Sequence, residues 1–415
     1  MANIFYGIAS ENNVKNNISK WIGIAGAPDI FCEKDENLKC YRAKLLGQYD
    51  VVSLDEALKR YPNADVWVTY RKAGVTAQAL LKKLPPERIH FLEADLEYRK
   101  GCSRLGRFIS YRKNNFSPCC VTGRCPIVPT TGSVRQRFEQ WQDYTTQLID
   151  DIRAGRPNAC EHCHLLKEGF WRKTVKLDEV SFGSNNPGDI CNFKCIYCFS
   201  KNSLIRLGND TDGFTTYEIL RQISEMPEYD TEDFTVQLSN GEFCANKHCE
   251  DMLDILLKTK WKINLVTNLS IYREKLSSLM KNGRLIKTLV SLDSGTRETF
   301  KKVRGVDAFD KVVENLKKYP TQNAKLILKY IFLEGLNDNE ADVDGFYQIV
   351  KDVGCSTITL SSDQTIGCPL FTDKIRELVL RLIKKAKRDG VMISSNSSYL
   401  DPKDAKFINE RYNSL

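Results

Sequence analysis

Strand-like and helix-like segments alternate regularly from about residue 181 to residue 370, and this alternation constrains the fold more than any other feature of the chain. Six short aliphatic runs are predicted strands: residues 178–184, 233–239, 262–268, 288–294, 325–333 and 356–362. The amphipathic segments between them are predicted helices: residues 215–226, 248–259, 270–282, 308–319 and 340–353. Six βα units predict an α/β fold built on a partial (βα)6 TIM-like barrel, short of the usual eight units.

The first hundred residues show a similar alternation on a smaller scale. Residues 14–21, 53–61 and 75–84 are predicted helices, and residues 21–26, 65–71 and 88–94 are predicted strands. Residues 1–100 are therefore predicted to form a small Rossmann-like α/β module. The run YDVVSLDEALKRYPNADVWVTYR resembles the modules that accompany sugar-modifying and glycan-locus proteins. No GxGxxG turn follows a strand, so a bound dinucleotide is not supported.

Two further regions flank the predicted barrel. Residues 101–180 are rich in Gly, Pro and Cys apart from a helical stretch at 134–155, and are predicted to be a cysteine-rich connector. The barrel is assigned to residues 181–370, and residues 371–415 are predicted to form a C-terminal helical extension.

The chain carries 15 cysteines among 415 residues, although the rest of its composition is typical of a globular protein. Its first residues show no basic stretch followed by an apolar run, so a reducing, cytoplasmic location is expected and disulfides are the weaker interpretation. No segment approaches the roughly 20 apolar residues of a membrane span. Cysteines in such a compartment point to metal or redox chemistry or to small buried hydrophobic side chains.

Three of these cysteines follow the first predicted barrel strand in the pattern C-x3-C-x2-C: Cys191, Cys195 and Cys198. A structural zinc site would need a fourth ligand, and such sites are usually built from paired C-x2-C units. A four-iron cluster held by only three thiolates instead leaves one iron open. The carboxyl end of a barrel strand is also where barrel enzymes carry their active sites.

This spacing, with the aromatic Tyr197 just before the third cysteine, resembles the signature of the radical S-adenosylmethionine (radical SAM) superfamily. The resemblance implies a [4Fe-4S] cluster on the three cysteines and S-adenosylmethionine at the open iron. Later segments follow the order of the family's motifs over residues 180 to about 365. Asn240, Gly241 and Glu242 stand where the family usually has Gly-Gly-Glu, which binds the amino group of the methionine moiety.

Further positions are implied to bind S-adenosylmethionine by the same resemblance. Thr267 and Asn268 follow the third strand, and Ser291 and Asp293 follow the fourth, placed to meet ribose hydroxyls or the methionine carboxylate. Arg304 is a second candidate for that carboxylate. Each of these residues has strand-end capping as its alternative role. Lys329 and Glu334 match the family's adenine- and methionine-contacting region less sharply.

The resemblance implies that the enzyme reductively cleaves S-adenosylmethionine to methionine and a 5'-deoxyadenosyl radical, which abstracts hydrogen from a C–H bond under anaerobic conditions. The electron would come from a low-potential donor, a flavodoxin or a ferredoxin. An apolar barrel interior is expected, because the radical must be kept from water and stray hydrogen donors.

A second group of cysteines precedes the barrel. An auxiliary iron-sulfur cluster is assigned to this group, drawing its ligands from Cys102, Cys119, Cys120, Cys125, Cys160 and Cys163. His162 and His164 beside the last pair keep a zinc site as an alternative. The family's SPASM and twitch domains place such cysteines after the barrel, so this arrangement departs from their pattern. Cys244, Cys249, Cys355 and Cys368 are expected to be core thiols, although Cys244, Cys249 and Cys368 are also candidate hydrogen donors.

The leading hypothesis for the substrate is a carbohydrate or a nucleotide-linked sugar, supported by the N-terminal module and by the net charge of +8. A ribosomally made peptide or protein, modified by a radical maturase, is the alternative. A non-catalytic iron-sulfur or zinc protein is a third possibility, which predicts no turnover of S-adenosylmethionine. Most of the positive charge is interpreted as solvated helix faces, and no nucleic-acid partner is expected.

Overall fold

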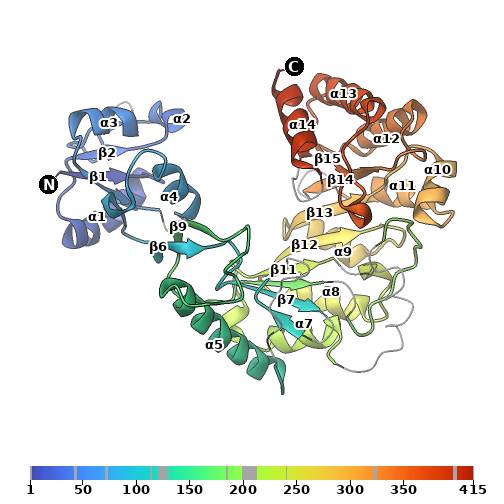
Figure 1. The fold of residues 1–415 in the computed structure, drawn as a ribbon, viewed down its shortest axis with the longest axis horizontal. Helices are drawn as coiled ribbons and strands as arrows, with labels where there is room; N and C mark the ends of the chain where they lie inside the picture. The colour runs from blue at the N-terminus through green and yellow to red at the C-terminus, as the bar shows by residue number, and fades with distance from the viewer. Residues whose placement is uncertain are drawn as a thin grey trace. The chain divides into compact units, whose positions relative to one another are not determined.

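The computed structural model describes residues 2–41, 44–70, 73–112, 115–119, 128, 130–183, 186–198, 213–239, 241–320, 325–395 and 400–414 (Figure 1). The chain divides into two compact units. Unit 1 comprises Met1–Arg107 and Gln142–Lys176, and unit 2 comprises Phe108–Trp141 and Leu177–Leu415. The segment 101–180, expected as a connector, thus contributes residues to both units.

Unit 1 is built on a five-stranded parallel sheet in the order β3-β2-β1-β4-β5. Its strands are β1 (Asn3–Tyr6), β2 (Ile30–Cys32), β3 (Val51–Val52), β4 (Asp65–Val68) and β5 (Ile89–Phe91), and its helices are α1 (Glu11–Ala25), α2 (Asp35–Leu38), α3 (Leu54–Arg60), α4 (Gly74–Leu80) and the 3-10 turn η1 (Pro86–Arg88). Neighbouring side chains of β1 enter different apolar clusters, Ile4 with residues of α3 and α4 and Phe5 with residues of α1. This doubly wound order is Rossmann-like, as predicted.

The strand predicted at residues 21–26 is wrong, because these residues complete α1. Ser10 caps the helix by accepting a hydrogen bond from the backbone N–H of Asn13, and α1 continues to Ala25. Trp21 is fully buried, whereas Ile24 is 54% exposed. The apolar run therefore follows helical periodicity with one surface-exposed side, which a six-residue window does not distinguish from a strand.

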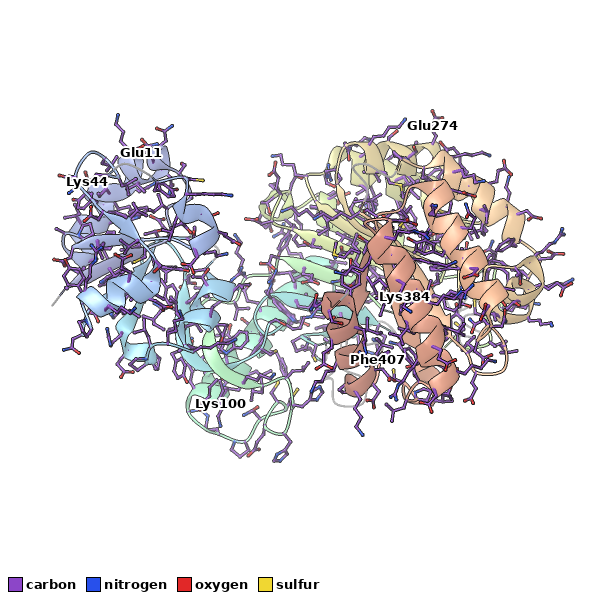
Figure 2. All side chains as sticks on the ribbon, turned by 90° about the horizontal axis from the view of Figure 1, so that it is seen from above. Glu11, Lys44, Lys100, Glu274, Lys384 and Phe407 are labelled. Carbon is purple, nitrogen blue, oxygen red and sulfur yellow. The ribbon has the colours of Figure 1, made fainter. Side chains whose placement is uncertain are left out.

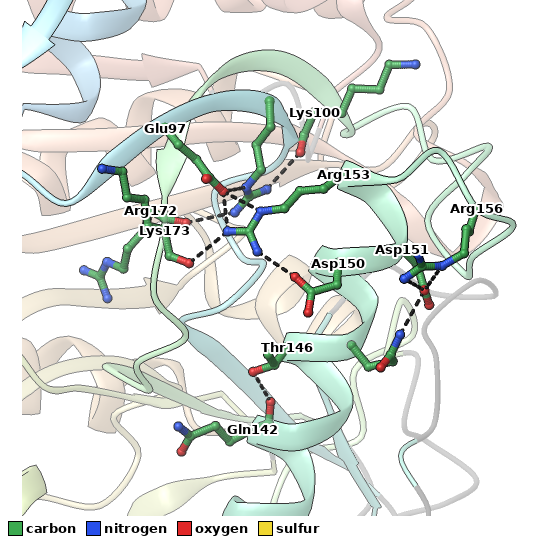
Figure 3. A network of polar contacts seen from close by, with 12 residues as sticks. Glu97, Lys100, Gln142, Thr146, Asp150, Asp151, Arg153, Arg156, Arg172 and Lys173 are labelled. Atoms are coloured by element: carbon green, nitrogen blue, oxygen red, sulfur yellow. Dashed lines mark hydrogen bonds and ion pairs between the residues drawn. The ribbon is translucent and has the colours of Figure 1, made fainter.

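Unit 1 is completed by an antiparallel pair, β6 (Leu96–Gly101) and β9 (Lys167–Arg172), and by the second half of α5 (Val134–Arg153). Figure 3 shows Arg153 of α5 directed at Glu97 of β6, with Nε donating to the carboxylate at 2.9 Å, and at Asp150, 2.6 Å from its Nη1. The contact with Glu97 attaches the end of the helix to the β6–β9 pair, whereas the contact with Asp150 lies within the helix.

Unit 2 contains a nine-stranded sheet in the order β16-β15-β14-β13-β12-β11-β10-β7-β8, parallel throughout except for the β7–β8 pair. The strands are β7 (Phe108–Arg112), β8 (Asn115–Ser117), β10 (Glu179–Phe182), β11 (Thr235–Leu238), β12 (Lys262–Thr267), β13 (Leu285–Ser291), β14 (Leu326–Phe332), β15 (Thr357–Ser362) and β16 (Met392–Ser395). The helices are α7 (Thr216–Ser224), α8 (Cys249–Lys258), α9 (Glu274–Lys281), α10 (Arg297–Arg304), α11 (Phe309–Lys318), α12 (Glu340–Val353), α13 (Asp373–Arg388) and α14 (Pro402–Ser414). Short 3-10 turns are η2 (Pro227–Tyr229), η3 (Phe243–Ala245) and η4 (Gln364–Ile366).

All six predicted barrel strands are present as β10 to β15, and each predicted helix between them is found. The fold is thus the predicted partial parallel barrel, extended by β16 at one edge and by β7 and β8 at the other. None of the described helices is both long enough and apolar enough to cross a membrane.

The two faces of the barrel sheet differ in polarity. Val180, Val236, Ile263, Leu328 and Ile358 lie on the outer face and are at most 1% exposed. Side chains one residue away along each strand point to the opposite, inner face. That face mixes apolar residues with a polar set: Glu179, Ser181, Gln237, Asn264, Lys287, Ser291, Lys329, Thr359 and Ser361. The expectation of an apolar interior is therefore wrong for much of this face.

Candidate active site

The three cysteines of the C-x3-C-x2-C pattern lie in the loop that follows β10. Backbone hydrogen bonds attach this loop to the end of α10, from the N–H of Lys194 to the carbonyl of Arg304 and from that of Ile196 to Val303, both at 3.1 Å. Cys195 is 9% exposed, and Cys191 and Cys198 are partly buried.

The three thiols are close enough to affect one another electrostatically. Burial raises the pKa of Cys191 to about 11, and the nearby charges of Glu242 and Cys195 act in the same direction. The pKa of Cys195 is raised by burial and, to a smaller extent, by Cys198. Cysteine thiolates are the ligands that iron-sulfur clusters use. The positive charge of a bound metal stabilises the thiolates and so lowers the pKa values that burial raises.

The loop after β11 docks directly on the cysteine loop. Gly241 has a left-handed backbone (φ +56°), and the N–H of Glu242 donates to the carbonyl of Ile190 at 2.7 Å. A Cβ added at Gly241 would lie 2.2 Å from that same carbonyl oxygen. Only glycine allows the two loops to approach so closely. Asn240, predicted beside it, lies outside the described residues.

We expect Gly241→Ala to destabilise unit 2 by about 1–3 kcal/mol and to weaken binding of S-adenosylmethionine, because the new methyl group forces the two loops apart. Thermal unfolding and equilibrium dialysis measure the two effects. Gly283→Ala is the matched control: Gly283 also has a positive φ (+73°), but no atom lies within 4 Å of its added Cβ. If both variants lose the same stability and the same affinity for S-adenosylmethionine, backbone strain alone causes the losses and the contact between the loops does not.

Glu242 connects three of the predicted site segments. It is 1% exposed, and its carboxylate accepts hydrogen bonds from Thr267 Oγ1 and from the N–H of Asn268, both at 2.6 Å, and from the N–H of Cys244 at 3.1 Å. Burial raises the pKa of Glu242, and these hydrogen bonds oppose the shift. Two strong donors to one carboxylate fix its orientation without occupying every lone pair.

Asn192 of the cysteine loop extends this connection. Its Oδ1 accepts from Asn268 Nδ2 at 2.9 Å, and its own Nδ2 donates to Ser270 Oγ at 2.8 Å. The ends of β10, β11 and β12 are thus tied together by side-chain hydrogen bonds. Asn192 was not predicted as a site residue.

Tyr197, Asp293 and Arg304 form a second buried cluster. Arg304 Nη1 lies 3.1 Å from Asp293 Oδ2, and the Tyr197 hydroxyl hydrogen-bonds both. Arg304 is 5% exposed, and its guanidinium lies 5.2 Å from the centre of the Phe193 ring. Its Nε is buried without a hydrogen-bond partner among the described residues.

Asp293 is held in an unusual backbone conformation. Its φ is +58°, its Oδ1 accepts from the N–H of Ile331 at 2.9 Å, and its carbonyl accepts from Asn337 Nδ2 at 2.8 Å. Burial raises the pKa of Asp293, although Arg304 lowers it. Asn337 was not predicted as a site residue; it is fully buried and also accepts from the N–H of Leu333.

The remaining predicted positions are distributed as follows. Ser291 ends β13 on the inner face, beside its register partner Lys329 of β14, and Glu334 is exposed in the turn after β14. Cys244, Cys249 and Cys355 are buried as expected. Cys368 is only partly buried, so its assignment to the core is wrong, because it lies in the loop after β15 rather than on a packed element.

The upstream cysteines lie in both units. Cys102 and Cys160 pack against one apolar cluster of unit 1, and Cys163 closes a turn by donating its N–H to the carbonyl of Cys160 at 3.0 Å. Cys119 belongs to unit 2, and Cys120 and Cys125 lie outside the described residues. Within the described ranges no group of three or more Cys, His, Asp or Glu side chains is arranged to hold a single metal ion, here or elsewhere. The auxiliary cluster stays a prediction.

Residues 185–346 match the family described as the Radical SAM superfamily. GTP 3',8-cyclase of Clostridium perfringens is 29% identical over 164 residues, which cover 39% of this chain and 50% of the relative. A probable GTP 3',8-cyclase of Saccharolobus islandicus is 26% identical over 180 residues, 43% of this chain and 55% of the relative. The chain thus spans about half the length of these curated relatives.

A solved structure with a similar arrangement is that of Streptococcus suis SuiB, which is 11% identical, with a TM-score of 0.40 over 64% of this chain and 56% of that one. The family match covers β11 to β14 and both loop clusters described above. Residues 185–346 therefore form a radical SAM domain.

Proposed function

We propose that the chain is a radical SAM enzyme that cleaves S-adenosylmethionine reductively and abstracts hydrogen from a C–H bond of a carbohydrate or nucleotide-linked substrate. The observation that carries the proposal is the convergence of the cysteine loop, Glu242 and the Asp293–Arg304 pair at the carboxyl ends of neighbouring parallel strands. When bound, a [4Fe-4S] cluster carrying S-adenosylmethionine supplies the electron that generates the 5'-deoxyadenosyl radical.

The residues of this chain have separate parts in the proposal. Cys191, Cys195 and Cys198 hold the iron, and Glu242, fixed by Thr267 and Asn268, accepts from the methionine ammonium group. Arg304 Nε, buried and unpartnered within the described structure, is left to donate to the methionine carboxylate. Asp293 and Tyr197 hold the guanidinium in place for this contact, and Ser291 reaches toward the same ligand from β13.

The nucleotide-linked substrate class is supported by the names of the relatives, which are GTP 3',8-cyclases. The doubly wound sheet of unit 1 is compatible with a nucleotide-linked ligand as well. We include an auxiliary iron-sulfur cluster near Cys102, Cys160 and Cys163, since two of these thiols share one apolar cluster. An acidic flavodoxin or ferredoxin suits the net charge of +8 as the electron donor in a reducing cytoplasm.

The test is anaerobic reconstitution with iron and sulfide, followed by reduction in the presence of S-adenosylmethionine. We expect 5'-deoxyadenosine and methionine in equal amounts. A protein that holds its cluster, shown by its absorbance and iron content, and yet forms no 5'-deoxyadenosine would overturn the proposal. Iron content also tests the auxiliary site. The double variant Cys160→Ala, Cys163→Ala should contain about four irons per chain, against about eight in the wild type.

A further inference from the structure

Unit 1 contains a cleft of about 310 Å3 at the carboxyl ends of two of its strands. Its walls come from residues at the ends of β1 and β2 and from α3 and α4, which pack on one face of the sheet. Small-molecule sites are often of this size, and in open α/β sheets they lie outside the carboxyl ends of the strands. All residues that line the cleft belong to unit 1, whereas the cysteine loop belongs to unit 2. The cleft is therefore a separate candidate site.

The loop after β1, where doubly wound folds usually bind a phosphate group, is filled by side chains of this chain. Glu33 is 2% exposed, and its carboxylate accepts hydrogen bonds from the N–H of Ile8 at 2.7 Å and from the Tyr70 hydroxyl at 2.9 Å. A Cβ added at Gly7 would lie 2.3 Å from the Tyr70 ring, so the ring covers this part of the loop. The N–H of Ile8 is therefore not available to a phosphate group.

Three polar groups on the wall of the cleft have no hydrogen-bond or ion-pair partner in the part of the chain that the structure describes. They are the hydroxyls of Tyr6 and Thr76 and the carboxylate of Asp35, the first residue of α2. Burial raises the pKa of Tyr6, and the negative charges of Glu33 and, to a smaller extent, Asp35 raise it further, so its hydroxyl lies near both carboxylates. These three groups are available to a ligand.

The charged residues of the cleft leave little net charge for a ligand to balance. Glu33 is already engaged, since it also accepts from the N–H of Lys34 at 2.9 Å, and Asp55 pairs with Lys83 at 2.5 Å. The side chains of Lys34 and Asp35, adjacent after β2, have opposite charges. A phosphate group would be repelled by three carboxylates, and an organic cation by two ammonium groups. A hydroxyl group both donates and accepts hydrogen bonds, so it suits charged groups of either sign.

An apolar surface borders these polar groups. Leu54 and Leu80 are buried in the wall, at most 8% exposed, whereas Val75 of α4 is 87% exposed. A ligand that covers Val75 removes this apolar surface from water, which favours binding. The cleft thus combines an apolar surface with a few polar groups, as ligand sites usually do.

We propose that the cleft of unit 1 binds a neutral sugar ring, whose hydroxyl groups bond to Asp35, Tyr6 and Thr76 and whose C–H face packs on Val75. A sugar ring carries hydroxyl groups at its edge and C–H groups on its faces, so it matches both kinds of surface in the cleft. The inference goes beyond the proposed function, because it places a carbohydrate-binding site outside the radical SAM domain. Binding at this site requires no cleavage of S-adenosylmethionine.

The test is a titration of the full-length reconstituted protein with glucose, galactose and mannose, followed by saturation-transfer difference NMR. We expect saturable binding of at least one hexose by the wild type. Asp35→Asn, Tyr6→Phe and Thr76→Val, which each remove one charge or hydroxyl, should bind it about two- to tenfold more weakly. Glu11→Gln is the matched control and should bind as the wild type does. Glu11 is also an exposed acidic residue that begins a helix of unit 1, but it does not line the cleft (Figure 2).

Absence of saturable binding by all three hexoses would overturn the inference, and so would equal affinities of the wild type and the three cleft variants. If Tyr6→Phe fails to fold, the other two variants decide, because neither Asp35 nor Thr76 is buried. A loss of affinity in Glu11→Gln as large as in Asp35→Asn would also contradict the inference, because it would indicate general surface charge.

Three analogues show which feature of the ligand is recognised. Glucosamine carries a positive charge, glucose 6-phosphate carries a negative one, and cyclohexanol is a ring with a single hydroxyl group. Tighter binding of either charged sugar than of the best hexose, or equal binding of cyclohexanol, would contradict a site for a neutral sugar. A protein that binds a hexose but forms no 5'-deoxyadenosine would contradict the proposed function alone.

Discussion

Replacement of Cys191, Cys195 or Cys198 by alanine abolishes 5'-deoxyadenosine formation, and the loss should be complete for each single variant. Each thiolate is one of only three ligands proposed for the cluster, so no second group in the loop replaces it. The fold should survive the change, because the loop is held by backbone hydrogen bonds to Arg304 and Val303 rather than by the thiols. Anaerobic turnover, iron content and the cluster absorbance give the measurement.

Cys40→Ala is the matched control, since Cys40 is an exposed cysteine of unit 1 far along the chain from the site loops. It should reconstitute and turn over as the wild type does. Retention of more than background 5'-deoxyadenosine by any of the three loop variants would contradict the assignment of that cysteine. A low circular dichroism signal or a broad elution profile would instead identify an unfolded variant. At that position a serine variant is then measured in place of the alanine variant.

The strands and helices of the barrel were predictable because the residue pattern of each segment favours the structure that the segment adopts. Alternating or continuous aliphatic runs such as residues 325–333 specify a strand without reference to other segments. α10 was missed because its eight residues bury only a few apolar side chains, among them Phe300 and Val303, between many charged ones. β16 was missed because its four residues join the sheet only through pairing with β15.

The candidate site was predictable only where one short segment carries the signal. Cys191 to Cys198 and Glu242 lie in such segments, and the sequence indicated them without knowledge of the fold. Asn337 and Asn192 act through contacts with residues 44 and 76 positions away, and a lone asparagine has no local pattern to reveal this. The polar inner face was unpredicted for a related reason, because it becomes visible only when the register of five strands is known.

The second prediction concerns the buried ion pair between Arg304 and Asp293. Arg304→Met should lower the free energy of unfolding of unit 2 by about 3–5 kcal/mol at neutral pH, because the fully buried Asp293 loses its cationic partner. The pKa of Asp293 is already raised by burial and must rise further without Arg304. Above the ordinary aspartate pKa of about 3.9, Asp293 is ionised in the unfolded chain but stays protonated in the folded variant. Folding of the variant therefore takes up a proton, so its stability falls as pH rises.

The deficit of Arg304→Met relative to the wild type should therefore shrink as pH is lowered from about 7 toward about 4, because protonation of Asp293 in the folded variant removes the uncompensated charge. Urea unfolding at several pH values measures this change. Arg297→Met on the same helix is the control: Arg297 is 61% exposed and pairs with Asp307 at the surface, so its loss should change stability little at any pH. A second replacement, Asp293→Asn, should recover part of the stability of Arg304→Met, because it removes the uncompensated charge. No recovery, or a deficit independent of pH, would show that Arg304 stabilises the fold by packing on Phe193 rather than by its charge.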